Sequence, residues 1–462
     1  MKLEECRLES AFLPGAASAR CGWFEIAENR GDPASKRIRI HVAVVPALRR
    51  QPLPDPIVII SGGPGQAASD FYLSSAPAFE AMRRDRDLLI VDQRGTGKSE
   101  LLDCALPDEF EGTRFDVEVI KQYTRVCLRE LKGDPRFYST SVAVRDLDEI
   151  RETLGYEQVN LYGISYGTRV AQHYLRRFPK RVRTIILDGV VPVQTALGPE
   201  IAPAAQAALD AILNRCAAQI ECQQKFPSLR EDLAEMFTRL ARSSMALQVA
   251  DPRTGILRRM DFNYMQLAAA LRLHSYNDDT ASLLPFLIHE AAHDRPELMA
   301  AQALLVARSV NEQVANGMHN AVVCTEDIPF ITPDALKDPS IDRSYLRRFF
   351  IDALIAMCSV WPRGVIDEDF HSPLASDAPA LLLSGANDPV TPNEYGERAA
   401  RSFKHGLHIV VPQHGHGQLS NPCVSRAMQH FIDRGSTDDL DIGCVAKQAA
   451  APFMLSAASP KP

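Results

Sequence analysis

Residues 159–168 read Val-Asn-Leu-Tyr-Gly-Ile-Ser-Tyr-Gly-Thr, an apolar strand-like run that leads into Gly-x-Ser-x-Gly and then into a helical segment. A serine at a tight strand-to-helix turn is held in a strained conformation that projects its hydroxyl. The flanking glycines avoid collisions with neighbouring backbone. This stretch therefore predicts that Ser165 is a nucleophile above a sheet. A chance match in an ordinary turn is the alternative, and the flanking strand and helix argue against it.

Short apolar runs on both sides of this stretch predict the rest of the sheet. Residues 56–61 and 87–92 each end in a Gly-rich loop, which is typical of parallel strands covered by helices on both faces. An eight-stranded, mostly parallel α/β sheet is the resulting prediction. Its other strands are expected at residues 23–27, 37–45, 158–162, 182–187, 380–384 and 407–411.

Long Ala- and Leu-rich segments with helical periodicity occupy residues 194–363, including 202–216, 229–241 and 264–273. Because strand-like segments resume afterwards, this region is interpreted as a helical cap inserted into the sheet domain. The predicted division is residues 1–193 and 364–448 for the two parts of the core and 194–363 for the cap. The Ala-, Ser- and Pro-rich residues 449–462 are expected to be a disordered tail.

A serine nucleophile of this kind requires an acid and then a histidine further along the chain. Asp388 follows the strand predicted at residues 380–384, the position where such sheets keep catalytic side chains. Asp188 is the competitor, but it precedes a glycine and is expected to close a turn. His416 lies between two glycines after the last strand, and His414 is its alternative. We predict that His416 takes the Ser165 proton while Asp388 orients the imidazole.

Two backbone N–H groups are predicted to stabilise the developing oxyanion. The first belongs to Tyr166, at the N-terminus of the helix that follows the serine, where free N–H groups and the helix dipole favour negative charge. The second is expected in the Gly-rich loop after the strand at residues 56–61, from Gly63 first and Gly62 next. Glycine lets the backbone approach a substrate, and Pro64 stiffens the loop.

Two further matches are discounted. His289 and His293 enclose a His-Glu-x-x-His pattern, but no third zinc ligand is evident and the segment lies in the predicted cap. Gly97-Lys98-Ser99 resembles the end of a phosphate-binding loop, yet Asp92 stands where the opening glycine is needed. The sequence therefore predicts neither a metal site nor a cofactor.

Composition narrows the class of protein and its compartment. With 462 residues, 46% apolar content and a net charge of -7, the chain has no basic excess for nucleic acid and no apolar run of membrane-spanning length. Its ten cysteines fall in close-set groups, which predicts either five disulfides or several buried thiols. Disulfides would indicate an exported protein whose signal peptide was removed or not cloned, whereas the first residues alone indicate a cytoplasmic one.

These segments together resemble the prolyl and tripeptidyl aminopeptidase group of α/β-hydrolases. The resemblance rests on Gly62-Gly63-Pro64-Gly65, on the run from Asp92 to Ser99, on Gly163-Ile164-Ser165-Tyr166-Gly167 and on the Asp388 and His416 segments. Ser61 replaces the histidine usual in prolyl aminopeptidases, which casts doubt on proline specificity. Length and cysteine pattern look closer to the exported tripeptidyl branch, where similar cysteines form disulfides.

The resemblance implies the α/β-hydrolase fold, peptide substrates with a free N-terminus, and acidic cap residues that hold the substrate's amino group. Glu326 is the first candidate for that role and Asp327 the second, because a buried ammonium group needs a partner carboxylate. Capping a helix or facing solvent is the alternative for both. A carboxylesterase is the competing enzyme, since the same machinery hydrolyses esters. A non-catalytic binding module would not need the serine, acid and histidine together.

Overall fold

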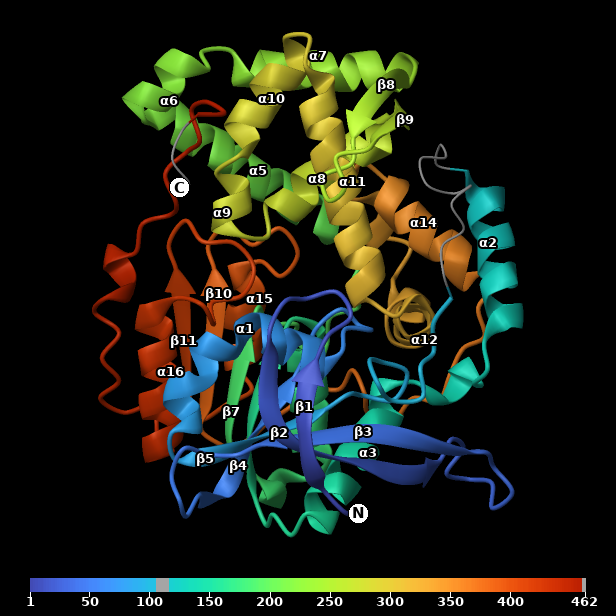
Figure 1. Cartoon of the computed structure of the whole chain (residues 1–462), viewed down its shortest axis with the longest axis vertical. Coiled ribbons are helices and arrows are strands. Elements are labelled where there is room, and N and C mark those ends of the chain that lie inside the picture. Colours follow the sequence, from blue (N-terminus) through green and yellow to red (C-terminus); the bar gives the residue numbers. More distant parts are fainter. Residues whose placement is uncertain (105–115, 459–462) are drawn as a thin grey trace.

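The computed structural model describes residues 1–104 and 116–458, and its described strands form a nine-stranded sheet and a separate hairpin (Figure 1). The sheet order is β1-β2-β3-β5-β4-β6-β7-β10-β11, and the six strands from β5 to β11 in that order run parallel. The predicted mostly parallel sheet is confirmed. It has nine strands rather than eight because β1 pairs antiparallel with β2. The strands of the sheet are β1 (Glu4–Glu9), β2 (Ala16–Ala27), β3 (Arg37–Val45), β4 (Leu53–Ile60), β5 (Arg86–Val91), β6 (Val159–Ile164), β7 (Val182–Asp188), β10 (Ala380–Gly385) and β11 (Gly406–Val411).

Helices cover both faces of the sheet because successive strand residues point to opposite sides. In β4, Val58 and Ile60 pack in the apolar cluster that includes residues of α3 and α4. Ile57 and Ile59 pack in the opposite cluster, with residues of α1 and α16. The sheet is therefore buried on both faces, as its continuous apolar strands require. The bounds of these helices are α1 (Ala68–Arg83), α3 (Thr140–Thr153), α4 (Tyr166–Arg177) and α16 (Pro422–Arg434).

A layer of helices lies above the ends of β10 and β11 in Figure 1 and has an apolar cluster of its own. It comes from the chain between β7 and β10. The predicted helical segments are present there, together with a hairpin of β8 (Met245–Ala250) and β9 (Leu257–Phe262) that the helical interpretation missed. The division into core and cap stays a prediction. The other helices described are α2 (Val117–Glu130), α5 (Ile201–Ala218), α6 (Ile220–Lys225), α7 (Leu229–Arg242), α8 (Tyr264–His274), α9 (Asp278–Ala281), α10 (Leu284–Ala292), α11 (Pro296–Gln313), α12 (Asn316–Glu326), α13 (Pro339–Arg343), α14 (Phe349–Cys358) and α15 (Asn393–Ala400).

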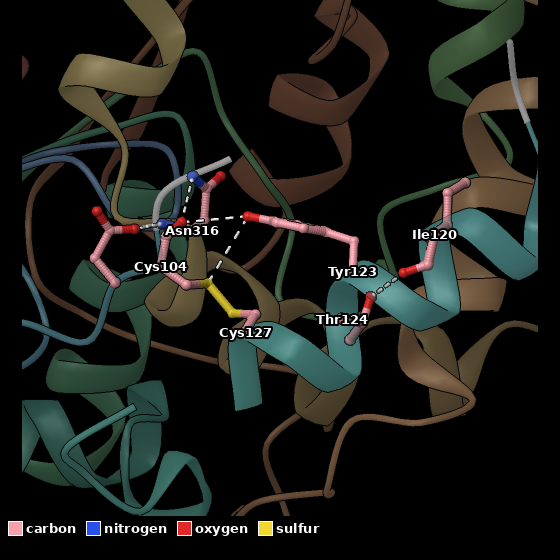
Figure 2. The surroundings of a disulfide bond; sticks show 7 residues. Cys104, Ile120, Tyr123, Thr124, Cys127 and Asn316 are labelled. Atoms are coloured by element: carbon pink, nitrogen blue, oxygen red, sulfur yellow. Dashed lines mark hydrogen bonds between the residues drawn. A yellow bond between two sulfur atoms is a disulfide. The ribbon is translucent and has the colours of Figure 1, made fainter. Parts of the chain in front are cut away.

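Helix α12 packs with the sheet, although it belongs to the chain between β7 and β10. Its residues Met318 and Val322 are fully buried in the same apolar cluster as the strands. Figure 2 shows the start of this helix, where the Asn316 side chain donates to the carbonyl oxygen of Cys104 at 3.5 Å. The Tyr123 hydroxyl donates to the same oxygen at 3.2 Å, beside the disulfide that joins Cys104 to Cys127. Helix α12 is thus held on the core by its apolar face and by its first turn.

All ten cysteines are paired in the structure, which decides between disulfides and buried thiols. The pairs are Cys6–Cys21, Cys104–Cys127, Cys216–Cys222, Cys324–Cys358 and Cys423–Cys444. Each joins cysteines that are close in sequence, so each closes a short loop. Within the described ranges, no helix is both long and apolar enough to cross a membrane.

The C-terminal segment is ordered further than its composition suggests. Phe453 is buried in the apolar cluster of the helical layer, and the guanidinium of Arg215 lies 3.8 Å from its ring centroid. Arg215 also donates to the carbonyl oxygen of Ala451, at 2.7 Å. Part of the segment expected to be disordered thus packs on the helical layer, because one aromatic side chain finds an apolar site. Residues 459–462 lie outside the described ranges.

Candidate active site

The predicted site residues gather at one edge of the sheet. Ser165 directly follows β6, Asp388 lies shortly after β10, His416 follows β11, and the Gly-rich loop containing Gly63 follows β4. Because these four strands run parallel, their carboxyl ends meet at the same edge, where ligands bind in open α/β sheets. Residues up to 353 positions apart in the sequence therefore follow strands that end at the same edge of the sheet.

Ser165 has the strained backbone expected of a nucleophile at a sharp turn. Its φ is 55°, in the left-handed region that a serine rarely adopts. The turn is held by the Ser165 N–H, which donates to the carbonyl oxygen of Asp188 at 2.8 Å. A side chain at Gly163 would collide with the carbonyl of Gly167, so the glycines of the motif are needed for close backbone contact. Ser165 itself is partly exposed.

His416 and Asp388 form a short hydrogen bond, with 2.7 Å between Nδ1 and the Oδ2 carboxylate oxygen. The other carboxylate oxygen of Asp388 accepts the backbone N–H groups of Val390 and Thr391, at 2.9 and 2.8 Å. These donors hold the carboxylate in one orientation. Its bond to Nδ1 favours the imidazole tautomer whose Nε2 lone pair is free to accept a proton.

The pKa of His416 is raised above its ordinary value of 6.5. Burial lowers the pKa by disfavouring the imidazolium, but the charge and hydrogen bond of Asp388 raise it and outweigh the burial. The charge of Asp188 adds to this effect. The site thus stabilises the protonated form of His416, as acid–base catalysis by this residue would require.

Asp188 proves to be more than the end of a strand. It is fully buried, and its carboxylate accepts the backbone N–H of Gln418 at 2.8 Å and that of Leu419 at 3.0 Å. It also accepts the Tyr162 hydroxyl at 2.8 Å. Burial raises the pKa of Asp188 to about 6 despite these donors. Its side chain therefore fixes the loop that presents His416, whereas Asp388 contacts the imidazole.

The end of β7 links the serine to the histidine. Its carbonyl at Asp188 holds the Ser165 N–H, and a Cβ added to the next residue, Gly189, would lie 2.8 Å from Cε1 of His416. The Ser165 N–H and the His416 ring therefore border the same turn, at Asp188 and Gly189. His414, the alternative base, instead forms an ion pair with Asp278 of α9. The structure thus brings His416 and not His414 to Asp388.

The Gly-rich loop closes over the serine from the other side. A Cβ added to Gly62 would lie 3.0 Å from Cβ of Ser165, so only glycine allows this approach. Gly63, the predicted donor, is exposed at the tip of the turn. The Ser61 hydroxyl donates to the carbonyl oxygen of Gln66 at 2.6 Å and so ties the two ends of the loop together. Tyr166 is the first residue of α4, where the N–H has no partner within the helix.

Tyr276 is a neighbour of the site that no sequence signal indicates. Its carbonyl oxygen accepts the His416 backbone N–H at 2.7 Å, and its ring meets the imidazole edge-on with 5.2 Å between centroids. The residue belongs to the segment between α8 and α9. The helical layer thus contacts the loop of the candidate base directly.

Glu326 and Asp327, predicted to bind the substrate's amino group, lie buried at the end of α12 and are bound to protein groups. Glu326 is 0% exposed and accepts the N–H and hydroxyl of Thr140 at 2.6 and 2.9 Å. Asp327 accepts from the guanidinium of Arg169 at 2.8 Å and from the Leu197 N–H at 2.7 Å. A substrate ammonium group cannot reach either carboxylate in this arrangement. They are needed inside the protein because Arg169 is itself buried in α4.

Asp92 and Arg94, from the second motif of the resemblance, are also structural. Asp92 is fully buried and accepts the Ser69 N–H and hydroxyl at 2.9 and 3.0 Å. Arg94 is buried against Asp146 and donates to the carbonyl oxygens of Glu28 and Phe137. These hydrogen bonds hold the loop after β5 in place, so both side chains are bound to protein groups and not directed to a substrate.

Comparisons with known proteins show the family of the chain and its relatives. A family described as alpha/beta hydrolase fold matches residues 55–420. Tripeptidyl aminopeptidase of Streptomyces coelicolor is 23% identical over 478 residues, which cover 94% of this chain and 84% of that protein. Serine protease Hip1 of Mycobacterium tuberculosis is 23% identical over 434 residues, 84% of this chain and 80% of its own. Carboxylesterase B of the same species is 25% identical over 474 residues, covering 95% and 89%.

Proposed function

The chain belongs to the alpha/beta hydrolase fold family and is a serine hydrolase, and on that premise we propose that it is an aminopeptidase that removes short pieces from the free N-termini of peptides. The observation that supports this most is the similarity to tripeptidyl aminopeptidase across 94% of the chain. That span includes the helical layer, which borders the candidate base and would shape the substrate site.

The proposed reaction uses Ser165, His416 and Asp388 in turn. The Ser165 hydroxyl oxygen attacks the scissile carbonyl carbon while Nε2 of His416 takes the hydroxyl proton. The resulting tetrahedral intermediate collapses, the C–N bond breaks, and His416 returns the proton to the leaving amine. Water then hydrolyses the acyl-enzyme through the same base. The carboxylate of Asp388 stabilises the imidazolium in both halves of the reaction.

The oxyanion of the tetrahedral intermediate would be held by the N–H groups of Tyr166 and Gly63. The start of α4 supports the first assignment, because its N–H groups and dipole point to the serine turn. The position of Gly62 against Ser165 supports the loop as the second source. Removing one such donor typically costs about 2.7–4 kcal/mol of transition-state stabilisation.

A carboxylesterase is the second candidate, favoured by the similarity to Carboxylesterase B over 95% of the chain. The alcohol of an ester leaves the tetrahedral intermediate more readily than the amine of a peptide does. A simple ester also has no free amino terminus for the enzyme to recognise. The two functions therefore differ in their dependence on a free amine. That difference, and not the chemistry at Ser165, is what an experiment must measure.

The deciding experiment is the release of aminocoumarin from single-residue, prolyl, dipeptidyl and tripeptidyl substrates, each with a free and a blocked N-terminus. We expect cleavage that requires both Ser165 and a free amine, with the tripeptidyl substrates preferred. Ser165→Ala should abolish it. His414→Ala is the matched control for His416→Ala and should keep most activity, since His414 pairs with Asp278.

Absence of aminocoumarin release, together with Ser165-dependent hydrolysis of short acyl esters, would refute the peptidase and leave the esterase. Equal cleavage of free and blocked peptides would also refute the aminopeptidase, because it would show an enzyme that does not recognise the amino terminus.

We also propose that the protein is exported. Five disulfides support this, because such bonds persist in oxidising compartments and are rare in the cytosol. Detection of the paired cysteines in protein isolated from its native compartment, by mass spectrometry without reduction, tests the proposal. Free thiols at these positions would contradict it.

A further inference from the structure

Three side chains of the metal-ligand type meet on two helices of the helical layer. Asp232 lies on α7, His289 on α10, and His293 is the residue that ends α10. Among the residues that the structure describes, these three form a group whose potential ligand atoms all lie within 4.8 Å of one another. Ser165, His416 and Asp388 are not part of it.

The spacing of the three ligands is close to that of a tetrahedral zinc site. Metal–ligand bonds of about 2.0–2.1 Å place neighbouring ligands about 3.3 Å apart. Nδ1 of His289 lies 3.1 Å from Oδ2 of Asp232, at that spacing already. His293 offers a third ligand atom within 4.8 Å of those of the other two residues. The His293 side chain is 55% exposed and can move the remaining distance without repacking the core.

Hydrogen bonds around the group orient two of its members. The Nδ1–H of His293 donates to the carbonyl oxygen of His289 at 2.8 Å, which leaves Nε2 with the free lone pair that a metal requires. The Ser228 hydroxyl donates to the other carboxylate oxygen of Asp232 at 3.2 Å. Such outer bonds are typical of metal-binding histidines and carboxylates. The Phe226 ring packs on His289, with 5.2 Å between centroids, and covers one side of the group.

Both histidines belong to the His-Glu-x-x-His pattern, yet its glutamate has another role. In zinc peptidases that use this pattern, the glutamate serves as general base beside the metal. Here the Glu290 carboxylate accepts from the Arg295 guanidinium at 2.7 Å. The sequence lacked a third ligand, and Asp232 supplies it from 57 residues away. With Glu290 paired to Arg295, the group lacks the free general base of such a catalytic centre.

We propose that Asp232, His289 and His293 bind one divalent transition-metal ion, Zn²⁺ by ligand type, which cross-links α7 to α10. The ion takes the place of the hydrogen bond between His289 and Asp232, and water fills its fourth position on the exposed side. Two imidazoles and a carboxylate suit zinc better than Ca²⁺ or Mg²⁺, which prefer oxygen ligands. An ion there would stabilise the helical layer without touching Ser165.

The test uses the full chain after chelator treatment, titrated with Zn²⁺ against a chromophoric chelator and with Co²⁺ followed by its visible absorption. We expect one equivalent of Zn²⁺ to bind, tetrahedral Co²⁺ absorption, and a higher unfolding temperature with Zn²⁺. His293→Ala should weaken Zn²⁺ binding at least about tenfold and remove the rise in unfolding temperature. Because His293 is exposed, this variant should fold normally. His289→Ala should likewise weaken Zn²⁺ binding and remove the rise in unfolding temperature.

Two matched variants serve as controls. Glu290→Gln keeps all three ligands, and His405→Ala removes an exposed histidine far along the chain, so both should bind Zn²⁺ as the wild type does. Ser165→Ala should also retain binding, which separates this site from the proposed hydrolysis. Wild-type binding no tighter than that of His293→Ala would overturn the proposal. So would equal weakening in Glu290→Gln or His405→Ala.

Discussion

At the scale of single residues, the chemistry of the candidate site depends on how Asp388 sets the proton affinity of His416. The imidazole is buried, which by itself would lower its pKa, and the carboxylate of Asp388, with a smaller contribution from Asp188, reverses this effect. A base must be neutral to act, so the raised pKa moves the onset of activity to higher pH. The histidine is thereby a stronger base once it is neutral.

Asp388→Asn should lower kcat by roughly 10³- to 10⁴-fold, because the amide favours the wrong imidazole tautomer. The residual activity should begin at lower pH than in the wild type, since loss of the charge lowers the pKa of His416. The pH profile of kcat/KM, measured on the best aminocoumarin or ester substrate, checks both. An acid limb that stays in place would contradict the assignment of Asp388.

Glu326 gives a second residue-scale prediction, on stability. Burial raises the pKa of its carboxyl from 4.5 to about 7, although Arg169 and Thr140 lower it in part. Because the folded pKa lies above the unfolded one, the folded protein loses stability as pH rises from about 4.5 to 7. Glu326→Gln has no such ionisation, so its free energy of unfolding relative to wild type should improve between pH 5 and pH 8. Denaturant unfolding at the two pH values measures this, and an unchanged difference would contradict it.

At the scale of elements, the site is made by the turns that end the parallel strands. The turn after β7 is the most constrained, since it holds the Ser165 N–H and borders the His416 ring. Gly189 has a φ of 65°, and its missing side chain leaves the room that the imidazole fills. The order of this turn therefore decides where the base lies.

Gly189→Ala should lower kcat/KM at least about tenfold, because its Cβ would displace the imidazole from Ser165 and a misplacement of about 1 Å can cost 10²-fold. Gly155→Ala is the matched control: Gly155 has a φ of 80° but nothing within 4 Å of an added Cβ. Both variants bear the same kind of backbone strain, of about 1 kcal/mol. Only the first should lose activity, and equal kinetics in both would contradict the role of this turn.

The elements also show what sequence can and cannot predict here. The strands and the order of Ser165, Asp388 and His416 are local patterns, and the structure brings the last two together. Contacts between distant segments have no local signal. Nothing near Glu326 indicates that Arg169, 157 residues earlier, needs a buried partner, and nothing near His416 indicates that Tyr276 packs on it. For the same reason the third ligand of the His289 group was invisible in the sequence.

At the scale of the whole molecule, each disulfide joins two cysteines of one segment of the chain, and none joins segments that are far apart in the sequence. The longest closed loop is that of Cys324–Cys358, with a separation of 34 residues, which joins α12 to the end of α14. The shortest, Cys216–Cys222, spans 6 residues at the end of α5. Longer loops restrict the unfolded chain more, so the two bonds should differ in their effect on stability.

Replacing Cys324 and Cys358 together by serine should lower the free energy of unfolding by about 3–4 kcal/mol, and the same change at Cys216 and Cys222 by about 2 kcal/mol. Urea unfolding without reductant measures both. Adding reductant to the wild type is the control. Because it breaks all five disulfides, it should lower the free energy of unfolding below that of either variant measured without reductant. A larger loss from the shorter loop would contradict the loop-length explanation.

The buried pairing of Arg169 with Glu326 and Asp327 has a consequence for how such a protein can evolve. Arg169 stands on α4, which follows the predicted nucleophile Ser165, while its acidic partners come from the chain between β7 and β10. If this insertion were exchanged as a unit for that of a relative, the guanidinium of Arg169 would stay buried without a partner charge near the candidate active site. The new insertion would have to place carboxylates at the same position. New specificities should therefore arise by changes in the outer helices, while α12 is inherited together with the sheet.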